Sequence, residues 1–301
     1  MTKVLITGGT GLVGSALSRF LKDKGFTPVI LSRNPKANSE FPMYKWDVNK
    51  GEIDKAAFNG VEHIIHLAGA NLGEKRWSKK RKQILIESRV KSAEFLFETI
   101  KNGNYKIKAF ISASAVGIYP SYTDNDTIFE EDSKLGNSFA AEICKRWESA
   151  ADDFKTIGIR TVKIRTGIVQ DINDPALEKI LLSAKFGILP AFGKGEHYYP
   201  WIHLKDLCRI YHTAIIDETF NGPYNAVAPD TITNKQYTKA IKKLRRKGFI
   251  LHIPAFFMKL LFGEMSQIIL RGTKVQSKLH KKDKFKFEFP TIESAMKDLL
   301  K

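Results

Sequence analysis

Short apolar segments alternate with longer amphipathic segments through the first half of the chain. The apolar segments predict strands, and apolar residues repeating every three or four positions predict helices. Expected strands are 4–7, 27–31, 61–68, 109–114 and 160–165, and expected helices are 15–24, 78–101 and 138–156. This alternation predicts an α/β fold with a doubly wound parallel sheet and right-handed crossovers.

The pattern becomes less regular beyond Gly167. Segment 187–200 is rich in Gly, Pro and aromatic residues, which is typical of a pocket-lining loop. A helix at 205–217 and a strand at 223–226 are expected to return to the sheet, followed by helices at 234–247, 254–262 and 292–300. We therefore expect a nucleotide-binding domain at 1–170 with 205–228. A smaller, mostly helical substrate-side subdomain is expected to comprise 171–204 and 229–301.

A glycine-rich loop follows the first strand and opens the first helix. It reads Gly8-Gly9-Thr10-Gly11-Leu12-Val13-Gly14, with glycines spaced three apart at 8, 11 and 14. Glycine permits a tight turn and close approach to a pyrophosphate, and the following helix N-terminus favours the phosphate charge. The loop predicts a Rossmann-type dinucleotide site formed by Gly8, Thr10, Gly11, Leu12, Val13 and Gly14.

The residues at the end of the second strand bear on the choice of cofactor. An acid there binds the ribose of NAD(H), whereas this chain has Ser32 and Arg33, which suit a 2′-phosphate. We therefore expect NADP(H), with NAD(H) less favoured, although a plain surface arginine is the alternative for Arg33. Segment 46–48, with Asp47, is expected to flank the adenine, and Ala68 and Gly69 the nicotinamide ribose.

These motifs together resemble the extended short-chain dehydrogenase/reductase superfamily, in its atypical group of epimerase family proteins (NAD-dependent epimerase/dehydratase-like). The resemblance rests on TGGTGLVGSAL (7–17), HLAGANLGEKRW (66–77), ESRVKSAEFL (87–96), SASAVGIY (112–119), RTGIV (165–169), PWIHLKDL (200–207) and GPYNAVAP (222–229). Segment 260–275, LLFGEMSQIILRGTKV, resembles the small C-terminal domain of unknown function in that group. The resemblance implies the fold and the cofactor, and it implies no particular substrate.

The superfamily uses a serine and a Tyr-x-x-x-Lys pair, and the resemblance places Ser114 at the serine position. The tyrosine and lysine positions hold Phe139 and Ile143, and no tyrosine in the chain precedes a lysine by four residues. Another acid could replace the pair, with Tyr119, Glu142 and Lys145 as candidates. Alternatively, the protein binds NADP(H) with little or no catalysis, or substrate groups or water move the proton. Our prediction takes Ser114 and Tyr119 as the catalytic residues of an oxidoreductase or epimerase. A weakly catalytic regulatory or interaction protein is the alternative.

The substrate side is predicted from the loops beyond the strand ends. Arg165 ends a strand and is assigned to the cofactor side, where open α/β sheets bind ligands. The substrate candidates are Asn71, Arg76, Trp77, Tyr199, Trp201 and His203. Arginine and aromatic residues suit an anionic or planar small molecule, here a polar carbonyl or sugar-like compound. The alternative for Trp77 and Trp201 is core packing, and for His203 a structural hydrogen bond.

Composition adds limits to possible partners and surroundings. The formal charge is +17, but the basic runs at 79–82, 242–247 and 280–284 lack interleaved aromatics, so no nucleic-acid partner is expected. No apolar run is long enough to span a membrane, there is no room for a signal peptide before the first strand, and two cysteines suit a reducing cytosol. We expect a cytoplasmic protein with no metal site and a small-molecule substrate. The oligomeric state is left open, with a homodimer as one alternative.

Overall fold

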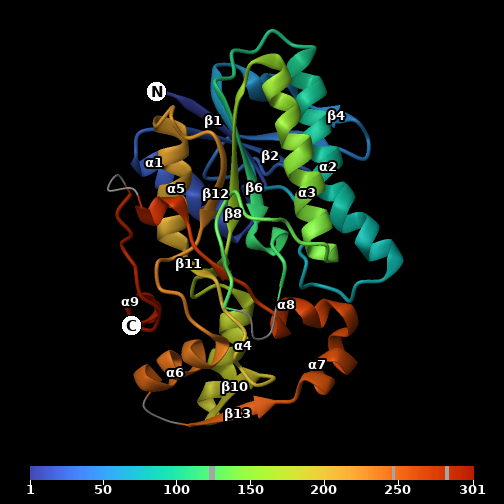
Figure 1. Ribbon diagram of the computed structural model, residues 1–301. Coiled ribbons are helices and arrows are strands. Elements are labelled where there is room, and N and C mark those ends of the chain that lie inside the picture. The colour runs from blue at the N-terminus through green and yellow to red at the C-terminus, as the bar shows by residue number, and fades with distance from the viewer. Residues whose placement is uncertain (122–125, 246–247, 282–284) are drawn as a thin grey trace.

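An eight-stranded sheet forms the centre of the molecule (Figure 1). The computed structural model describes residues 1–121, 126–245, 248–281 and 285–301. In spatial order the strands are β12 (Gly222–Ala226), β8 (Arg160–Thr166), β6 (Ala109–Ala115), β5 (Val61–His66), β1 (Lys3–Thr7), β2 (Thr27–Ser32), β3 (Met43–Asp47) and β4 (Glu52–Ile53). All neighbours pair in parallel except β3 and β4. The predicted doubly wound fold is confirmed.

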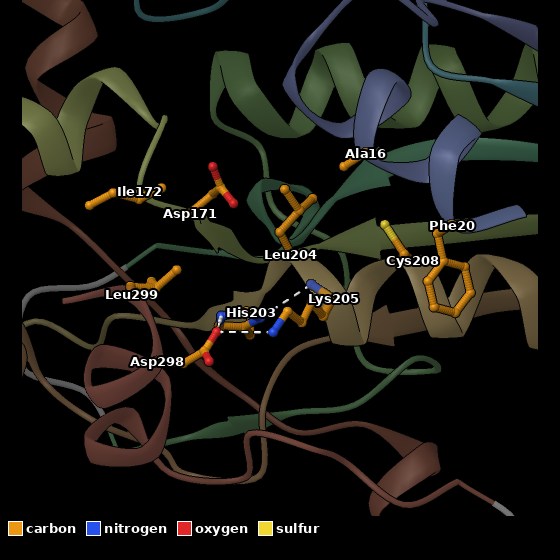
Figure 2. Close-up of a pocket in the computed structure, with 10 residues that line it drawn as sticks. All are labelled: Ala16, Phe20, Asp171, Ile172, His203, Leu204, Lys205, Cys208, Asp298 and Leu299. Carbon is orange, nitrogen blue, oxygen red and sulfur yellow. Dashed lines mark hydrogen bonds and ion pairs between the residues drawn. The ribbon is translucent and has the colours of Figure 1, made fainter. Parts of the chain in front are cut away.

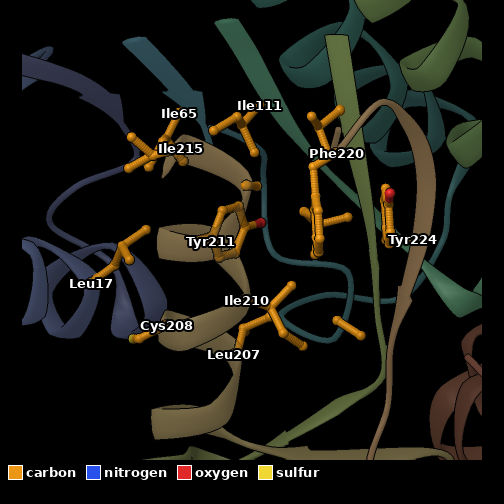
Figure 3. Packing of buried hydrophobic residues seen from close by; sticks show 14 of the residues in the cluster. Leu17, Ile65, Ile111, Leu207, Cys208, Ile210, Tyr211, Ile215, Phe220 and Tyr224 are labelled. Carbon is orange, nitrogen blue, oxygen red and sulfur yellow. The ribbon is translucent and has the colours of Figure 1, made fainter. Parts of the chain in front are cut away.

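Helices cover both faces of this sheet. One face carries α2 (Lys79–Lys101) and α3 (Phe139–Asp152), and the other carries α1 (Leu12–Asp23) and α5 (Leu204–Ile216). Figure 3 shows the core under α1 and α5, where Leu17, Ile65, Ile111 and Tyr211 pack together. Val4 and Ile6 of β1 face this core and Leu5 faces the other, so the strand is apolar throughout because both its faces are buried.

The strand order reverses direction between β1 and β5. Chain connections leave β1 toward β2 on one side and reach β5 on the other, so the segments that follow these two strands diverge at their carboxyl ends. Parallel α/β sheets bind their ligands at this switch point. The glycine loop after β1 and segment 67–70 after β5 border it.

A smaller part of the chain lies beyond the strand ends (Figure 1). Its helices are α4 (Pro175–Lys185), α6 (Asn234–Arg245), α7 (Ala255–Phe262), α8 (Gln267–Leu270) and α9 (Ile292–Leu299). Three short parallel pairs accompany them: β9 (Ile168–Gln170) with β11 (Trp201–His203), β10 (Ile188–Phe192) with β13 (Phe249–Ile253), and β7 (Ile128–Phe129) with β14 (Lys274–Val275). Within the described residues, no helix combines the length and apolarity needed to cross a bilayer.

Several predicted boundaries differ from the structure. Helix α1 starts three residues earlier than expected, and α3 gives way to a 3-10 helix at Asp153–Ile157. Strands β3, β10 and β13 and helix α4 were not predicted. Residues 246–247 at the end of one predicted helix and basic run, and 282–284 within another basic run, lie outside the described residues.

Candidate dinucleotide site and the buried network behind it

Three of the four glycines in the loop after β1, those spaced three apart, are suited to their positions for different structural reasons. Gly8 has φ +69°, and a Cβ there would lie 2.9 Å from the backbone carbonyl of Leu67. A Cβ on Gly14 would lie 2.3 Å from the carbonyl oxygen of Gly8, so Gly14 lets α1 pack closely on the loop. At Gly11 the single neighbour within 4 Å is that same oxygen, at 3.4 Å. Gly11 therefore leaves its outer side open, as a bound pyrophosphate requires.

The N-terminus of α1 carries no side-chain cap. Gly11 occupies the cap position, and no side chain accepts a hydrogen bond from the first-turn N–H groups. By contrast, Ser78, Ser138 and Asp174 cap α2, α3 and α4. Leu12 and Val13 anchor the helix start by packing on the core, while Thr10 and Gly11 are exposed. The free donors and helix dipole suit a diphosphate.

Two cations lie at the end of β2. Arg33 is exposed, and Lys45 of β3 sits opposite Ser32 in the sheet register and donates a hydrogen bond from Nζ to the Arg33 carbonyl at 2.6 Å. Ser32 Oγ accepts from the backbone N–H of Asn34. Lys45 was not predicted as a cofactor residue, because strand β3 was not predicted. The alternation of polar and apolar residues in β3 was the signal that could have identified the strand.

Asp47 ends β3, and its carboxylate accepts from the backbone N–H of Asn49 at 3.1 Å. Its neighbour Trp46 is buried and stacks on Phe95, so Trp46 belongs to the core and does not flank the adenine position. Of the three residues in that predicted segment, Asp47 and Val48 remain partly exposed.

Buried hydrogen bonds fix the segment after β5. Thr7 Oγ accepts from the N–H groups of Leu67 and Ala68 and bonds to His66 Nδ1 at 2.8 Å, while Ser92 bonds to His66 Nε2. Burial lowers the pKa of His66 to about 4, so the ring is neutral. Ala68 and the exposed Gly69 are thereby held beside the glycine loop.

Ser114 and Tyr119 belong to a buried polar network. Ser114 Oγ donates to Glu148 of α3 at 2.8 Å, and Arg165 donates to both oxygens of that carboxylate. Tyr119 is fully buried, receives a hydrogen bond from Arg165 and donates one to Asn225. Burial raises the pKa of Tyr119 to about 12.

This network corrects two sequence-based assignments. The Tyr119 hydroxyl is closed off from any substrate in this arrangement, because the short helix Val116–Ile118 turns the side chain inward against Phe129. Arg165 is 4% exposed and its guanidinium donates to Glu148, Tyr119 and the Glu131 carbonyl, so it faces the interior and not the cofactor side. Glu148 was missed, although a carboxylate on the apolar stripe of α3, one residue after Trp147, was a readable signal.

An apolar cluster fills the positions of the usual tyrosine and lysine. Phe139 meets Trp77 edge-on at 5.0 Å, and Ile143 packs with Trp77, Leu85 and Met265. Met265 comes from the C-terminal part of the chain. The other acid candidates, Glu142 and Lys145, lie toward solvent on α3, where Glu142 pairs with Arg146.

The predicted substrate residues divide between surface and core. Asn71 is exposed and its side chain accepts from the Gly73 N–H, and Arg76 donates to the Leu260 carbonyl. Trp77 and Trp201 are buried and donate from their indole nitrogens to the Leu72 and Asp230 carbonyls. Both tryptophans therefore pack in the core, which was the alternative to a substrate-binding role.

Tyr199 and His203 also have structural contacts. Tyr199 stacks on Tyr237 at 4.4 Å, and burial raises its pKa to about 12. His203 is 2% exposed, caps α5 through Nδ1 and stacks on Phe289 at 3.8 Å. Burial lowers the pKa of His203.

A cavity of about 320 Å³ lies between α1, α5 and α9 (Figure 2). Its wall includes His203, Lys205, Asp298, Phe20 and Cys208. None of the predicted cofactor residues lines it, so the cavity is separate from the glycine loop. In the part of the chain described, no three His, Cys, Asp or Glu side chains gather as metal ligands.

The sheet order, the glycine loop and the open start of α1 define a dinucleotide-binding α/β protein of the Rossmann type. Residues 4–226 match the NAD dependent epimerase/dehydratase family, and residues 253–299 match a domain of unknown function, DUF1731. The chain belongs to the NAD-dependent epimerase/dehydratase family. The predicted resemblance is confirmed.

Relatives of similar length are known. An epimerase family protein of Mycobacterium leprae is 31% identical over 97% of this chain and 94% of its own, and one from Staphylococcus aureus is 31% identical over the whole of both. A human epimerase family protein solved with NADPH superposes with a TM-score of 0.87 at 25% identity, covering 99% of each chain. A nucleoside-diphosphate sugar epimerase from Corynebacterium glutamicum has a TM-score of 0.76 at 30% identity, covering 99% of this chain and 58% of that one.

Proposed function

We propose that this protein is an NADP(H)-dependent oxidoreductase or epimerase acting on a small polar carbonyl or sugar-like compound. The observation that carries the proposal is the open glycine loop, where Gly11 leaves space beside an uncapped helix N-terminus. The adjacent cations Arg33 and Lys45 favour a 2′-phosphate. The NADPH complex of the human relative supports the same cofactor.

Different residues at the strand ends would bind different parts of the cofactor. The N–H groups at the start of α1 would hold the diphosphate, Arg33 and Lys45 the 2′-phosphate, and Ala68 and Gly69 would line the path toward the nicotinamide. A bound nicotinamide supplies or accepts a hydride. Ser114 is the last residue but one of β6 and is 3% exposed. Its hydroxyl donates a hydrogen bond to Glu148, so polarising a substrate oxygen requires this hydroxyl to turn away from Glu148.

The proton must come from another source than the usual tyrosine. Phe139 cannot donate a proton, Ile143 cannot lower a phenol pKa, and the Tyr119 hydroxyl is buried. We propose that a substrate hydroxyl or water moves the proton while the protein positions the hydride. Loss of a positioned acid costs about 10²–10⁴-fold in rate, so turnover is expected to be slow.

A second candidate function is NADP(H)-dependent regulation or protein interaction without appreciable turnover. The apolar cluster of Trp77, Phe139, Ile143 and Met265 favours it, because these side chains fill the space of the usual acid and join the C-terminal part to α3. Oxidation of NADPH, followed by absorbance against a panel of aldehydes and ketones, separates the two candidates.

Replacement of Arg33 by Ala is expected to weaken NADPH binding by about 1.5–3 kcal/mol, the scale of a hydrogen bond to a charged group. NADH, which lacks the 2′-phosphate, should bind the parent and the variant alike. Isothermal titration calorimetry measures both. Arg146→Ala removes the same charge from the exposed face of α3 and serves as the control. Equal affinity of the parent for NADH and NADPH would contradict the cofactor assignment.

Ser114→Ala and Tyr119→Phe are expected to separate a site residue from a structural one. With any substrate that turns over, Ser114→Ala should lower kcat by about 10²–10³-fold at unchanged NADPH affinity. Tyr119→Phe should keep kcat and lose about 1–3 kcal/mol of stability, because Arg165 and Asn225 lose a buried partner. Steady-state kinetics and urea unfolding test both. A fall in kcat for Tyr119→Phe with unchanged stability would restore Tyr119 as the acid.

A further inference from the structure

Large apolar side chains are exposed on helix α7. Four of them are between 47% and 69% exposed: Phe256, Phe257, Leu260 and Leu261. Their spacing of three and four residues places them on one side of the helix, whereas Met258 is buried beneath it. A continuous apolar face of this kind on a folded protein is typical of a contact site.

The strand before α7 extends this apolar face. Phe249 and Leu251 alternate along β13, share one side of the strand and are exposed. The end of α4 adjoins them, because the Phe249 N–H donates to the carbonyl of Gly187, the residue after Phe186. In the part of the chain described, the four most exposed phenylalanines all belong to this region. We call the following set the apolar edge: Phe186, Phe249, Leu251, Phe256, Phe257, Leu260 and Leu261.

The same part of the chain is strongly basic. Residues 231–263 contain eight lysines and arginines and no aspartate or glutamate. The next acid, Glu264, pairs with Lys82 at 2.6 Å. Figure 1 shows α6, β13 and α7 along one end of the molecule, away from the main sheet. The described bases of the segment are exposed on α6 and α7 and flank the apolar edge: Lys235, Lys239, Lys242, Lys243, Arg245 and Lys259.

This combination of charge and apolarity indicates which partner covers the surface. A second copy would bring the same bases against one another across a two-fold contact, and like charges oppose such an association. A nucleic acid would attract the bases, but it offers no apolar layer to Leu260 and Leu261. An anionic bilayer offers both negative headgroups for the bases and hydrocarbon for the phenylalanines and leucines.

We propose that β13 and α7 form a docking surface for an anionic lipid bilayer. The side chains of the apolar edge enter the boundary between headgroups and acyl chains, and the bases of α6 and α7 contact the headgroups. Contact of this kind requires no membrane-spanning helix. The inference goes beyond the proposed NADP(H) function and does not depend on it.

The docking surface adjoins the predicted substrate segment. Arg76 Nη2 donates to the Leu260 carbonyl at 2.8 Å, and Met265, shortly after α7, packs in one cluster with Trp77 and Ile143. A bilayer in contact with α7 would therefore lie beside the loop that carries Arg76 and Trp77.

Flotation of the full chain with lipid vesicles tests the proposal. Vesicles of phosphatidylcholine and phosphatidylglycerol in equal amounts should carry the protein, vesicles of phosphatidylcholine alone should carry little, and added salt should reduce binding. Phe256→Gln combined with Leu260→Gln should lower the affinity for the anionic vesicles by about 10- to 100-fold, because two apolar side chains no longer enter the bilayer. The melting temperature should match that of the parent, since both positions are exposed and glutamine favours helices.

Ile172→Gln combined with Ile216→Gln is the matched control. These isoleucines are exposed outside α6, β13 and α7, so vesicle affinity should stay at the parent's level. If the α7 variant does not fold, changing Lys242, Lys243 and Lys259 to Gln keeps the apolar edge and should also weaken binding to anionic vesicles by about 10-fold or more.

Three results would overturn the proposal: equal binding to neutral and anionic vesicles, unchanged vesicle affinity in the folded α7 variant, or no binding of the parent to either vesicle. If the last result accompanies a dimer that sediments as such and is lost in the α7 variant, the surface belongs to a second copy instead. NADPH affinity, measured on the same proteins by calorimetry, tests the proposed function separately, because no residue of the apolar edge belongs to the glycine loop or the end of β2.

Discussion

Removal of the Glu148 side chain is expected to destabilise the protein more than any other single change described above. In Glu148→Ala, Arg165 stays buried without its carboxylate, and Ser114 loses its acceptor. Breaking a buried ion pair from one side costs about 3–5 kcal/mol, because one charge is left uncompensated. Urea unfolding followed by circular dichroism measures the loss.

Two further variants test whether the unpaired charge of Arg165 causes that loss of stability. Glu142→Ala removes a half-exposed carboxylate from the same helix, where it pairs with Arg146 one turn on, and should cost at most about 0.5 kcal/mol. Changing both Glu148 and Arg165 to Met removes the unpaired charge and should recover part of the stability lost in Glu148→Ala. A loss below about 1 kcal/mol for Glu148→Ala would mean that water or a local shift solvates Arg165.

The second large effect is expected at Gly11. The backbone there has φ −80° and ψ 175°, which any residue adopts, and a Cβ meets just one atom, at 3.4 Å. Gly11→Val should therefore fold with a near-parental melting temperature. Its side chain would enter the space of the pyrophosphate and break N–H hydrogen bonds to a charged group, worth about 1.5–3 kcal/mol each, so NADPH affinity should fall by about 100-fold or more.

Gly14→Val provides the contrast within the same loop. A Cβ on Gly14 would collide with the Gly8 carbonyl oxygen at 2.3 Å and with Gly9 Cα at 2.6 Å, so this variant should lose stability together with binding. Thermal unfolding and calorimetry on the pair distinguish a blocked site from a broken loop. Normal NADPH binding by Gly11→Val would show that the cofactor does not lie over this glycine.

Local sequence patterns were sufficient to predict the strands buried on both faces and the glycine loop. Strands such as β1 and β5 are apolar runs because helices cover both sides, and the loop is one continuous motif. Strand β3 was missed because it lies near the sheet edge and mixes Lys45 with Trp46. Strands β10 and β13 pair with each other across a long stretch of chain, and no local pattern reports such a pairing.

The contacts of the candidate site could not be predicted for the same reason. Tyr119 was a reasonable acid from its nearness in sequence to Ser114, but its hydroxyl is held by Asn225, 106 residues further on. The partners of Arg165 come from three different segments. By contrast, the prediction for Ser32 and Arg33 uses position alone, because the end of the second strand has a fixed place in this fold.

The C-terminal part of the chain imposes an order on folding. The main sheet is complete once Ala226 has been made, yet the buried carboxylate of Glu131 accepts hydrogen bonds from Ser277 and from the Lys278 N–H. Asp206 in turn accepts from the N–H groups of residues 288 and 289.

At synthesis rates of about 5–20 residues per second, the carboxylates of Glu131 and Asp206 lack these hydrogen-bond donors for several seconds during synthesis. During that interval β7 lies outside the main sheet, and β14, the strand with which it pairs, has still to be made. A ribosome-bound chain ending before residue 274 should accordingly be far more sensitive to protease near residues 126–131 than the released protein, and binding of chaperones should concentrate at the same stage.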